Sequence, residues 1–260
     1  MNEKRHRSAP PAPAEETEGQ LEGRNALQEA LKSGRTIDKV FIASGEIDRG
    51  LQRLAAEAKE AGAVVVPVDR RKLDAMSFTR AHQGVIALAA AHIYYSIDDI
   101  LEEAASRGET PLIVICDELS DPHNLGAILR SAECAGAHGV IIPKRRSVGL
   151  TATVAKASAG AVEYMKVARV TNINSAITEL KEKGVWVFGT AAEGSIPMYK
   201  ADLTGPTAIV IGSEGDGMSQ LVRKNCDVMV SIPMKGRISS LNASAAASIL
   251  LYEAVRQRIG

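Results

Sequence analysis

The segment LIVICDELSDPHNLGAILRSAECAGAHGVIIP, residues 112–143, contains the pattern that decides the fold. It begins and ends with short, nearly continuous apolar runs, residues 112–117 and 139–143, which are typical of strands buried on both faces. Between these runs apolar residues recur at helical spacing, at Leu125, Ile128, Leu129, Ala132 and Ala135. A strand, a helix and a second strand in this order predict a βαβ unit with parallel strands.

The same alternation continues toward the C-terminus. Further strands are predicted at VWVFGT (185–190), AIVIG (208–212) and DVMVSIP (227–233), with helical patterns near residues 173–180 and 241–255. Residues 111–260 therefore predict an α/β domain whose parallel sheet is covered by helices on both faces.

The chain before residue 94 is organised differently. Residues 1–18 are rich in Pro, Ala, Glu and charge, and are expected to be a disordered tail. Residues 19–93 predict a small α/β domain, whose first helix runs from Leu21 to Leu31 and whose strands lie at 37–43, 63–68 and 84–90. Residues 94–110 carry a short helical pattern and are interpreted as a linker between the two domains.

Composition excludes several kinds of protein. There is no apolar run of about 18 residues and no apolar N-terminal stretch, so we expect a cytoplasmic protein without a membrane span. Cys116, Cys134 and Cys226 are far apart in apolar segments and are predicted to be buried thiols, with no disulfide framework and no metal site.

Net charge is zero, so any nucleic-acid contact has to come from local basic patches. The run Lys144, Arg145 and Arg146 directly follows a predicted strand, near the expected ligand edge of the sheet. By itself, such a run is better explained as a solvated surface.

Three segments follow predicted strands, where open parallel sheets bind ligands. In the first, DELSDPHNLGAILRSAE (117–133), Asp121 or Asn124 caps a helix and Arg130 points away from the apolar stripe. Taken alone, this segment is better explained by a surface pair between Arg130 and Glu133.

The second segment, IVIGSEGDGMS (209–219), contains three closely spaced glycines but matches neither a P-loop nor GxGxxG. Glycines let a backbone approach a ligand, although a tight turn with solvent-facing acids would look the same. In the third segment, SIPMKGRISSLNASAAASILLYEAV (231–255), Ser239, Ser240, Asn242 and Ser244 crowd a helix start that needs only one cap. The alanines that follow permit close approach of a backbone, a subunit or a flat ligand.

Together the three segments resemble, in order and spacing, the signature motifs of the SpoU or TrmH-type RNA methyltransferases of the SPOUT superfamily. These enzymes transfer a methyl group from S-adenosylmethionine to a ribose 2′-hydroxyl. Residues 19–93 resemble the ribosomal-protein-like substrate-binding domain of the RlmB-like 23S rRNA guanosine methyltransferases. The resemblance implies a deep trefoil knot in the C-terminal domain, a homodimer through the knotted region, and a hairpin or loop of large-subunit rRNA as partner.

The resemblance also assigns site residues. The expected catalytic residues are Asn124, Arg130, Glu214, Ser240 and Asn242. The expected contacts to S-adenosylmethionine are Gly189, Thr190, Ala191, Ile211, Gly212, Gly217, Ile232, Met234, Leu241 and Ala243.

Because a guanidinium keeps its proton at neutral pH, we expect Arg130 to hold a phosphate and stabilise charge on the ribose oxygen rather than to act as a base. Three alternatives remain open at this point. A tRNA ribose methyltransferase would share all the motifs, and a non-catalytic RNA-binding module would bind no cofactor. A nucleotide-dependent oxidoreductase would require a different glycine spacing.

Overall fold

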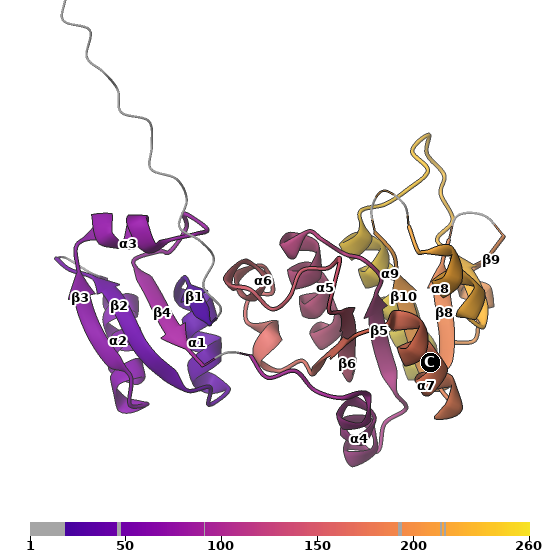
Figure 1. The fold of residues 1–260 in the computed structure, drawn as a ribbon, viewed down its shortest axis with the longest axis horizontal. Helices are drawn as coiled ribbons and strands as arrows, with labels where there is room; N and C mark the ends of the chain where they lie inside the picture. Colours follow the sequence, from indigo (N-terminus) through magenta and orange to yellow (C-terminus); the bar gives the residue numbers. More distant parts are fainter. Residues whose placement is uncertain (1–18, 46–47, 91, 192–193, 214, 216) are drawn as a thin grey trace, which may run out of the picture.

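The computed structural model describes residues 19–45, 48–90, 92–191, 194–213, 215 and 217–260. Over this part of the chain two α/β domains follow one another, each built around its own sheet (Figure 1). The predicted disordered tail, residues 1–18, lies outside the described residues. Among the helices described, none is both long and apolar enough to cross a membrane.

The N-terminal domain has a mixed sheet, in which β2 and β3 are parallel and β4 runs antiparallel to both β1 and β2. Across the described residues its strand order is β1-β4-β2-β3. The strands are β1 (Gln20–Glu22), β2 (Ile37–Ala43), β3 (Val64–Val68) and β4 (Val85–Ala89). The helices are α1 (Arg24–Lys32), α2 (Arg49–Glu60) and α3 (Arg70–Met76).

The predicted start of the first helix at Leu21 is wrong. Leu21 lies in β1 and pairs with Ala87 of β4, and α1 begins at Arg24 after Gly23, whose φ is +97°. Leu21 fits the apolar spacing of α1, but pairing with a strand more than 60 residues away decides its conformation.

The C-terminal domain has the predicted parallel sheet, which in the described part of the chain has the order β7-β6-β5-β10-β8-β11-β9. Its strands are β5 (Leu112–Cys116), β6 (Gly139–Pro143), β7 (Val167–Val170), β8 (Trp186–Thr190), β9 (Ile196–Pro197), β10 (Thr207–Ile211) and β11 (Val228–Ser231). Its helices are α4 (Ile97–Arg107), α5 (Pro122–Cys134), α6 (Ala152–Ala157), α7 (Ile173–Glu182), α8 (Gln220–Asn225) and α9 (Ala243–Ile259). Short 3₁₀ turns lie at Ala161–Glu163 and Met198–Lys200.

Both faces of this sheet are covered, as the apolar runs predicted. In β5, Leu112 and Val114 pack into the cluster that contains α5, α6 and α9, whereas Ile113 and Ile115 pack into the cluster that contains α4 and α7. Successive side chains of a strand point to opposite faces, so a strand buried on both sides must be apolar throughout.

Two further observations concern the sequence predictions. Asp121 caps α5 by accepting a hydrogen bond from the His123 backbone N–H at 2.8 Å, one of the two caps proposed. The prediction of three buried thiols is wrong for Cys134, which is exposed, whereas Cys116 is buried and Cys226 is half-buried. Cys134 is the last residue of α5 and is not among the buried residues of that helix.

Candidate active site

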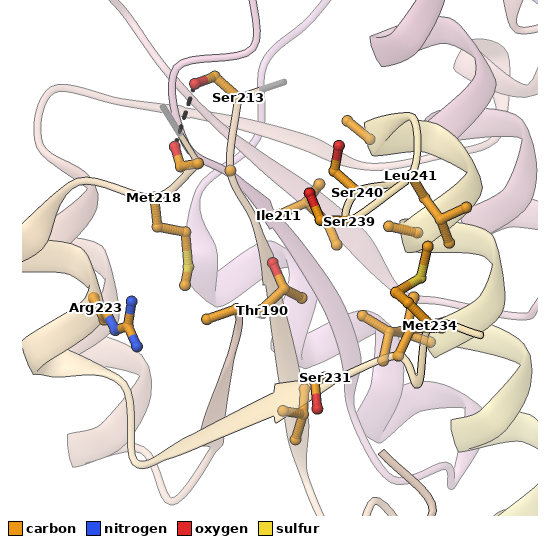
Figure 2. A pocket seen from close by; sticks show the side chains of 18 of the residues that line it. Thr190, Ile211, Ser213, Met218, Arg223, Ser231, Met234, Ser239, Ser240 and Leu241 are labelled. Carbon is orange, nitrogen blue, oxygen red and sulfur yellow. Dashed lines mark hydrogen bonds between the residues drawn. The ribbon is translucent and has the colours of Figure 1, made fainter. Parts of the chain in front are cut away.

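A cavity of about 620 Å³ opens at the carboxyl ends of β8, β10 and β11 (Figure 2). Its walls are the ends of these strands, the chain that follows β10 and β11, and the first turns of α9. The predicted cofactor residues that line it are Thr190, Ala191, Ile211, Gly212, Gly217, Ile232, Met234, Leu241 and Ala243. Gly189, which was also predicted, precedes Thr190 in β8 and does not line the cavity.

The glycine-rich segment forms one wall because it folds back on itself. Ser213 and Gly217 exchange two backbone hydrogen bonds, each 3.1 Å long, and Gly217 has a φ of +68°. A Cβ on Gly212 would lie 2.3 Å from the carbonyl carbon of Gly217, so only glycine permits this turn. The tight-turn reading of these glycines is therefore correct, and the same turn also borders the cavity.

The lining of the cavity fits S-adenosylmethionine. Its volume lies within the range of about 300–1,000 Å³ usual for small-molecule sites. Met234 and Leu241 provide exposed apolar side chains in the lining, and the hydroxyls of Ser231 and Ser239 lie beside them (Figure 2). In the described part of the chain, His, Cys, Asp and Glu form no group of three that could hold a metal ion.

The first and third sequence motifs meet beside this cavity. The Asn242 side-chain amide donates a hydrogen bond to Oδ1 of Asn124 at 2.8 Å. Asn242 also caps α9, accepting from the backbone N–H groups of Ser244 and Ala245 at 2.9 and 3.2 Å. Asn124, only 6% exposed, lies in the first turn of α5. The Asn242 side chain therefore links the N-terminus of α9 to the N-terminus of α5.

The remaining predicted catalytic residues are placed differently from one another. Ser240 lines the cavity next to Ser239 (Figure 2). Arg130 is exposed on α5, as its position off the apolar stripe predicted, and does not line the cavity. Glu214 lies outside the described residues.

The predicted basic run is exposed on the same edge of the sheet as the cavity. Lys144, Arg145 and Arg146 directly follow β6, and the parallel strands place the ends of β6 and β10 at one edge. Arg146 pairs with Glu118 at 3.1 Å and has a φ of +59°. Lys144 and Arg145 are exposed at this edge, two strands away from β10 in the sheet order.

Sequence reasoning missed several residues of this site. Ser213, Met218, Arg223 and Ser231 line the cavity without having been predicted. Two of them follow the rule for ligands in parallel sheets, because Ser231 ends β11 and Ser213 comes shortly after β10. Another missed residue is Asp117, just beyond β5, which is 4% exposed and accepts a hydrogen bond at 2.9 Å from the Ser219 backbone N–H. This contact anchors the end of the glycine-rich turn to the neighbouring strand.

Fold and site together define an α/β ligand-binding domain, with its cavity at the carboxyl edge of a parallel sheet, preceded by a small α/β domain. The chain belongs to the SpoU rRNA methylase family, whose family model matches residues 111–252. A second family model, RNA 2′-O ribose methyltransferase substrate binding, matches residues 20–95. The predicted enzyme class, an RNA 2′-O-ribose methyltransferase, is confirmed.

Individual relatives agree with this assignment. The chain is 48% identical over 236 residues to YacO of Bacillus subtilis, a protein of the TrmH family of tRNA/rRNA methyltransferases, covering 91% of this chain and 94% of YacO. It is 44% identical over 240 residues to the 23S rRNA (guanosine-2′-O-)-methyltransferase RlmB of Ralstonia nicotianae, covering 92% and 95% of the two chains. The solved structure of the SpoU methyltransferase AviRb from Streptomyces viridochromogenes, in complex with the cofactor AdoMet, has a TM-score of 0.81 at 27% identity and covers 93% of this chain and 90% of AviRb.

Proposed function

We propose that this chain transfers a methyl group from S-adenosylmethionine to the ribose 2′-hydroxyl of a guanosine in 23S rRNA. The observation that carries the proposal is the match to RlmB of Ralstonia nicotianae, which spans both domains at 44% identity. Because the match includes the substrate-binding domain as well as the methylase domain, it bears on the RNA substrate and on the chemistry together.

S-adenosylmethionine is proposed to occupy the cavity at the ends of β8, β10 and β11. The cavity volume, its apolar wall and its hydroxyl groups fit this cofactor, and AviRb, whose fold is similar, was solved with AdoMet. When bound, the cofactor supplies a methyl group that is already activated, so the protein mainly has to position the acceptor.

The chain's own residues would orient the target ribose and stabilise its oxygen. Ser240 lies in the cavity wall, and Asn242, two residues further along the chain, holds Asn124 by a hydrogen bond. Arg130 is proposed to hold the target phosphate and to stabilise negative charge on the 2′-oxygen, because a guanidinium does not give up its proton at neutral pH. Glu214 is proposed to help orient Arg130 or the ribose.

RNA is proposed to bind across both domains. Lys144 and Arg145 would contact phosphates near the cavity, while the N-terminal domain, residues 19–93, would recognise the shape and exposed bases of a hairpin. In this proposal residues 94–110 connect the two domains, and their helix α4 packs on the C-terminal sheet through Ile97 and Ile100.

A homodimer through the C-terminal domain is part of the proposal, together with the trefoil knot that the family resemblance implies. Exposed apolar side chains of the C-terminal domain outside the cavity support the dimer: Ile238 is 72% exposed and Tyr252 51%. Light scattering coupled to size exclusion tests this point, and a mass of 27.5 kDa, that of one chain, would contradict it.

A tRNA substrate is the second candidate, because YacO belongs to a family of tRNA/rRNA methyltransferases. The deciding experiment incubates the purified chain with radiolabelled S-adenosylmethionine and, separately, unmodified rRNA and tRNA, and then identifies the labelled nucleoside. Label in 2′-O-methylguanosine from 23S rRNA supports the proposal. Label only in tRNA supports the second candidate, a tRNA substrate. No label in either RNA contradicts both candidate substrates.

A further inference from the structure

The two domains are packed against each other, beyond their covalent connection. Helix α1 of the N-terminal domain contacts α6 and the 3₁₀ turn Ala161–Glu163 of the C-terminal domain, and strand β1 contacts α6 (Figure 1). Leu27 of α1 and Val154 of α6 belong to one continuous cluster of buried side chains. A Cβ on Gly160 would lie 2.3 Å from Cγ of Glu29, so α1 approaches the backbone of the other domain very closely.

One polar contact across this junction is a buried ion pair. Arg35 of the N-terminal domain donates to Glu163 of the C-terminal domain at 2.9 Å, and their side chains are only 9% and 4% exposed. The Arg35 guanidinium also donates to the Ala90 carbonyl at 2.9 Å, and its Nη1 lies 2.6 Å from Nε2 of His92. Burial and the charge of Arg35 lower the pKa of His92 to about 4, so the ring is neutral near pH 7 and accepts this hydrogen bond.

This pair lies on a loosely packed side of the junction. A cavity of about 380 Å³ lies beside it and is lined by residues of both domains, among them Ser33, Arg35, Glu163 and Lys166. Close packing therefore does not fix the geometry on this side of the junction. Two buried charges are compensated only when they meet correctly, so other docking orientations are disfavoured.

A second polar contact lies on the α6 side of the junction. Lys156 of α6 donates to Oγ1 of Thr79 at 2.9 Å and to the carbonyl of Ala81 at 3.0 Å. The loop that it contacts is held from within its own domain by Glu22, 1% exposed, whose carboxylate accepts hydrogen bonds from the Phe78 backbone N–H at 2.7 Å and from the Thr79 hydroxyl. Lys156 therefore donates hydrogen bonds to a loop of the N-terminal domain that Glu22 holds in place.

We infer that the Arg35–Glu163 pair and the Lys156 contact are two clasps that hold the substrate-binding domain in one orientation on the methylase domain, and that these residues position bound RNA for methyl transfer. The inference rests on the proposed function for its RNA substrate. None of the three residues touches the cavity at the ends of β8, β10 and β11, so they act as positioning residues through the domain orientation. A small misplacement of the acceptor is enough to lower the rate of a positioned reaction strongly.

The test is the double variant Lys156→Met with Glu163→Gln. Its two controls are Lys156→Arg, which keeps a donor, and Lys183→Met, which removes a lysine that pairs within the C-terminal domain. Amide hydrogen exchange is followed in α1 and α6, which face the junction, and in β5, which is remote from it. Affinities for S-adenosylmethionine and for the RNA are measured separately from kcat.

In the double variant we expect faster exchange in α1 and α6 with unchanged exchange in β5. Both affinities should stay within about twofold, while kcat falls about tenfold or more because fewer bound RNA molecules are aligned. Both control variants should behave as the wild type. Unchanged exchange at the junction, or faster exchange with unchanged kcat, would overturn the inference. If the wild-type chain methylates no RNA, the proposed function fails and the positioning role fails with it, whereas the exchange measurement still decides whether the clasps hold the domains together.

Discussion

Asn242 donates its side-chain amide to Asn124 at 2.8 Å, joining the first turns of α9 and α5 across 118 positions of sequence. The same Asn242 side chain caps α9, so it has two separable functions. The amide oxygen accepts the hydrogen bonds of the cap, and the amide nitrogen donates the hydrogen bond to Asn124, here called the bridge.

Substitutions at Asn242 should separate these functions. Asn242→Asp keeps an oxygen for the cap but loses the donor to the buried Oδ1 of Asn124, so we expect a smaller fall in melting temperature than for Asn242→Ala, together with reduced turnover. Asn242→Ala loses both functions, and the cap alone is worth about 1 kcal/mol of stability. Thermal unfolding and methylation rates check this. Full activity of Asn242→Asp would show that the bridge is not needed for catalysis.

Gly212→Ala should remove cofactor binding. The added methyl group would lie 2.3 Å from the backbone of Gly217 and would force the turn that borders the cavity to open. Gly205→Ala is the control, because Gly205 does not line the cavity and a Cβ there would meet no atom within 4 Å. Calorimetry with S-adenosylmethionine is the measurement. Equal affinities of the two variants would show that the turn does not shape the cofactor site.

Arg130→Ala should abolish turnover and leave cofactor affinity intact. Arg130 is exposed on α5 and does not line the cavity, so its removal does not alter the proposed cofactor site. Losing a group that stabilises charge in the transition state typically costs about 100- to 1,000-fold in kcat. Calorimetry and single-turnover kinetics measure the two effects. Retained turnover would remove Arg130 from the mechanism.

Neutral substitutions of Lys144 and Arg145 should weaken RNA binding without changing its sequence preference. Each lost phosphate contact should reduce the slope of log affinity against log salt by about 0.7–0.9. Arg146→Ala serves as a comparison and should have a smaller effect, because Arg146 already pairs with Glu118. Filter binding at several salt concentrations measures the slopes. An unchanged slope would show that Lys144 and Arg145 do not contact RNA phosphates.

Some features of this protein could be read from local sequence, because their cause is local. A strand buried on both faces must be apolar at every position, which is why β5 and β6 were found where the apolar runs predicted. Asp121 and Pro122 marked the start of α5 through the hydrogen-bonding needs of a first helical turn. The motifs that resemble the SpoU family were local as well, and the family they indicated is confirmed.

The remaining features depend on which segments the fold brings together. Leu21 has helical spacing but becomes a strand because β4 offers backbone partners. Cys134 lies in an apolar segment but is exposed at the last residue of α5.

Three segments had to converge before a cavity existed, and Arg35 and Glu163 had to meet across the domain junction before either could be buried. By itself, then, the sequence determined the periodic elements and the chemistry carried by each segment, because backbone geometry and capping act over a few residues. Only the tertiary structure decided which distant groups share a site, because burial and pairing depend on packing between segments that are far apart in the chain.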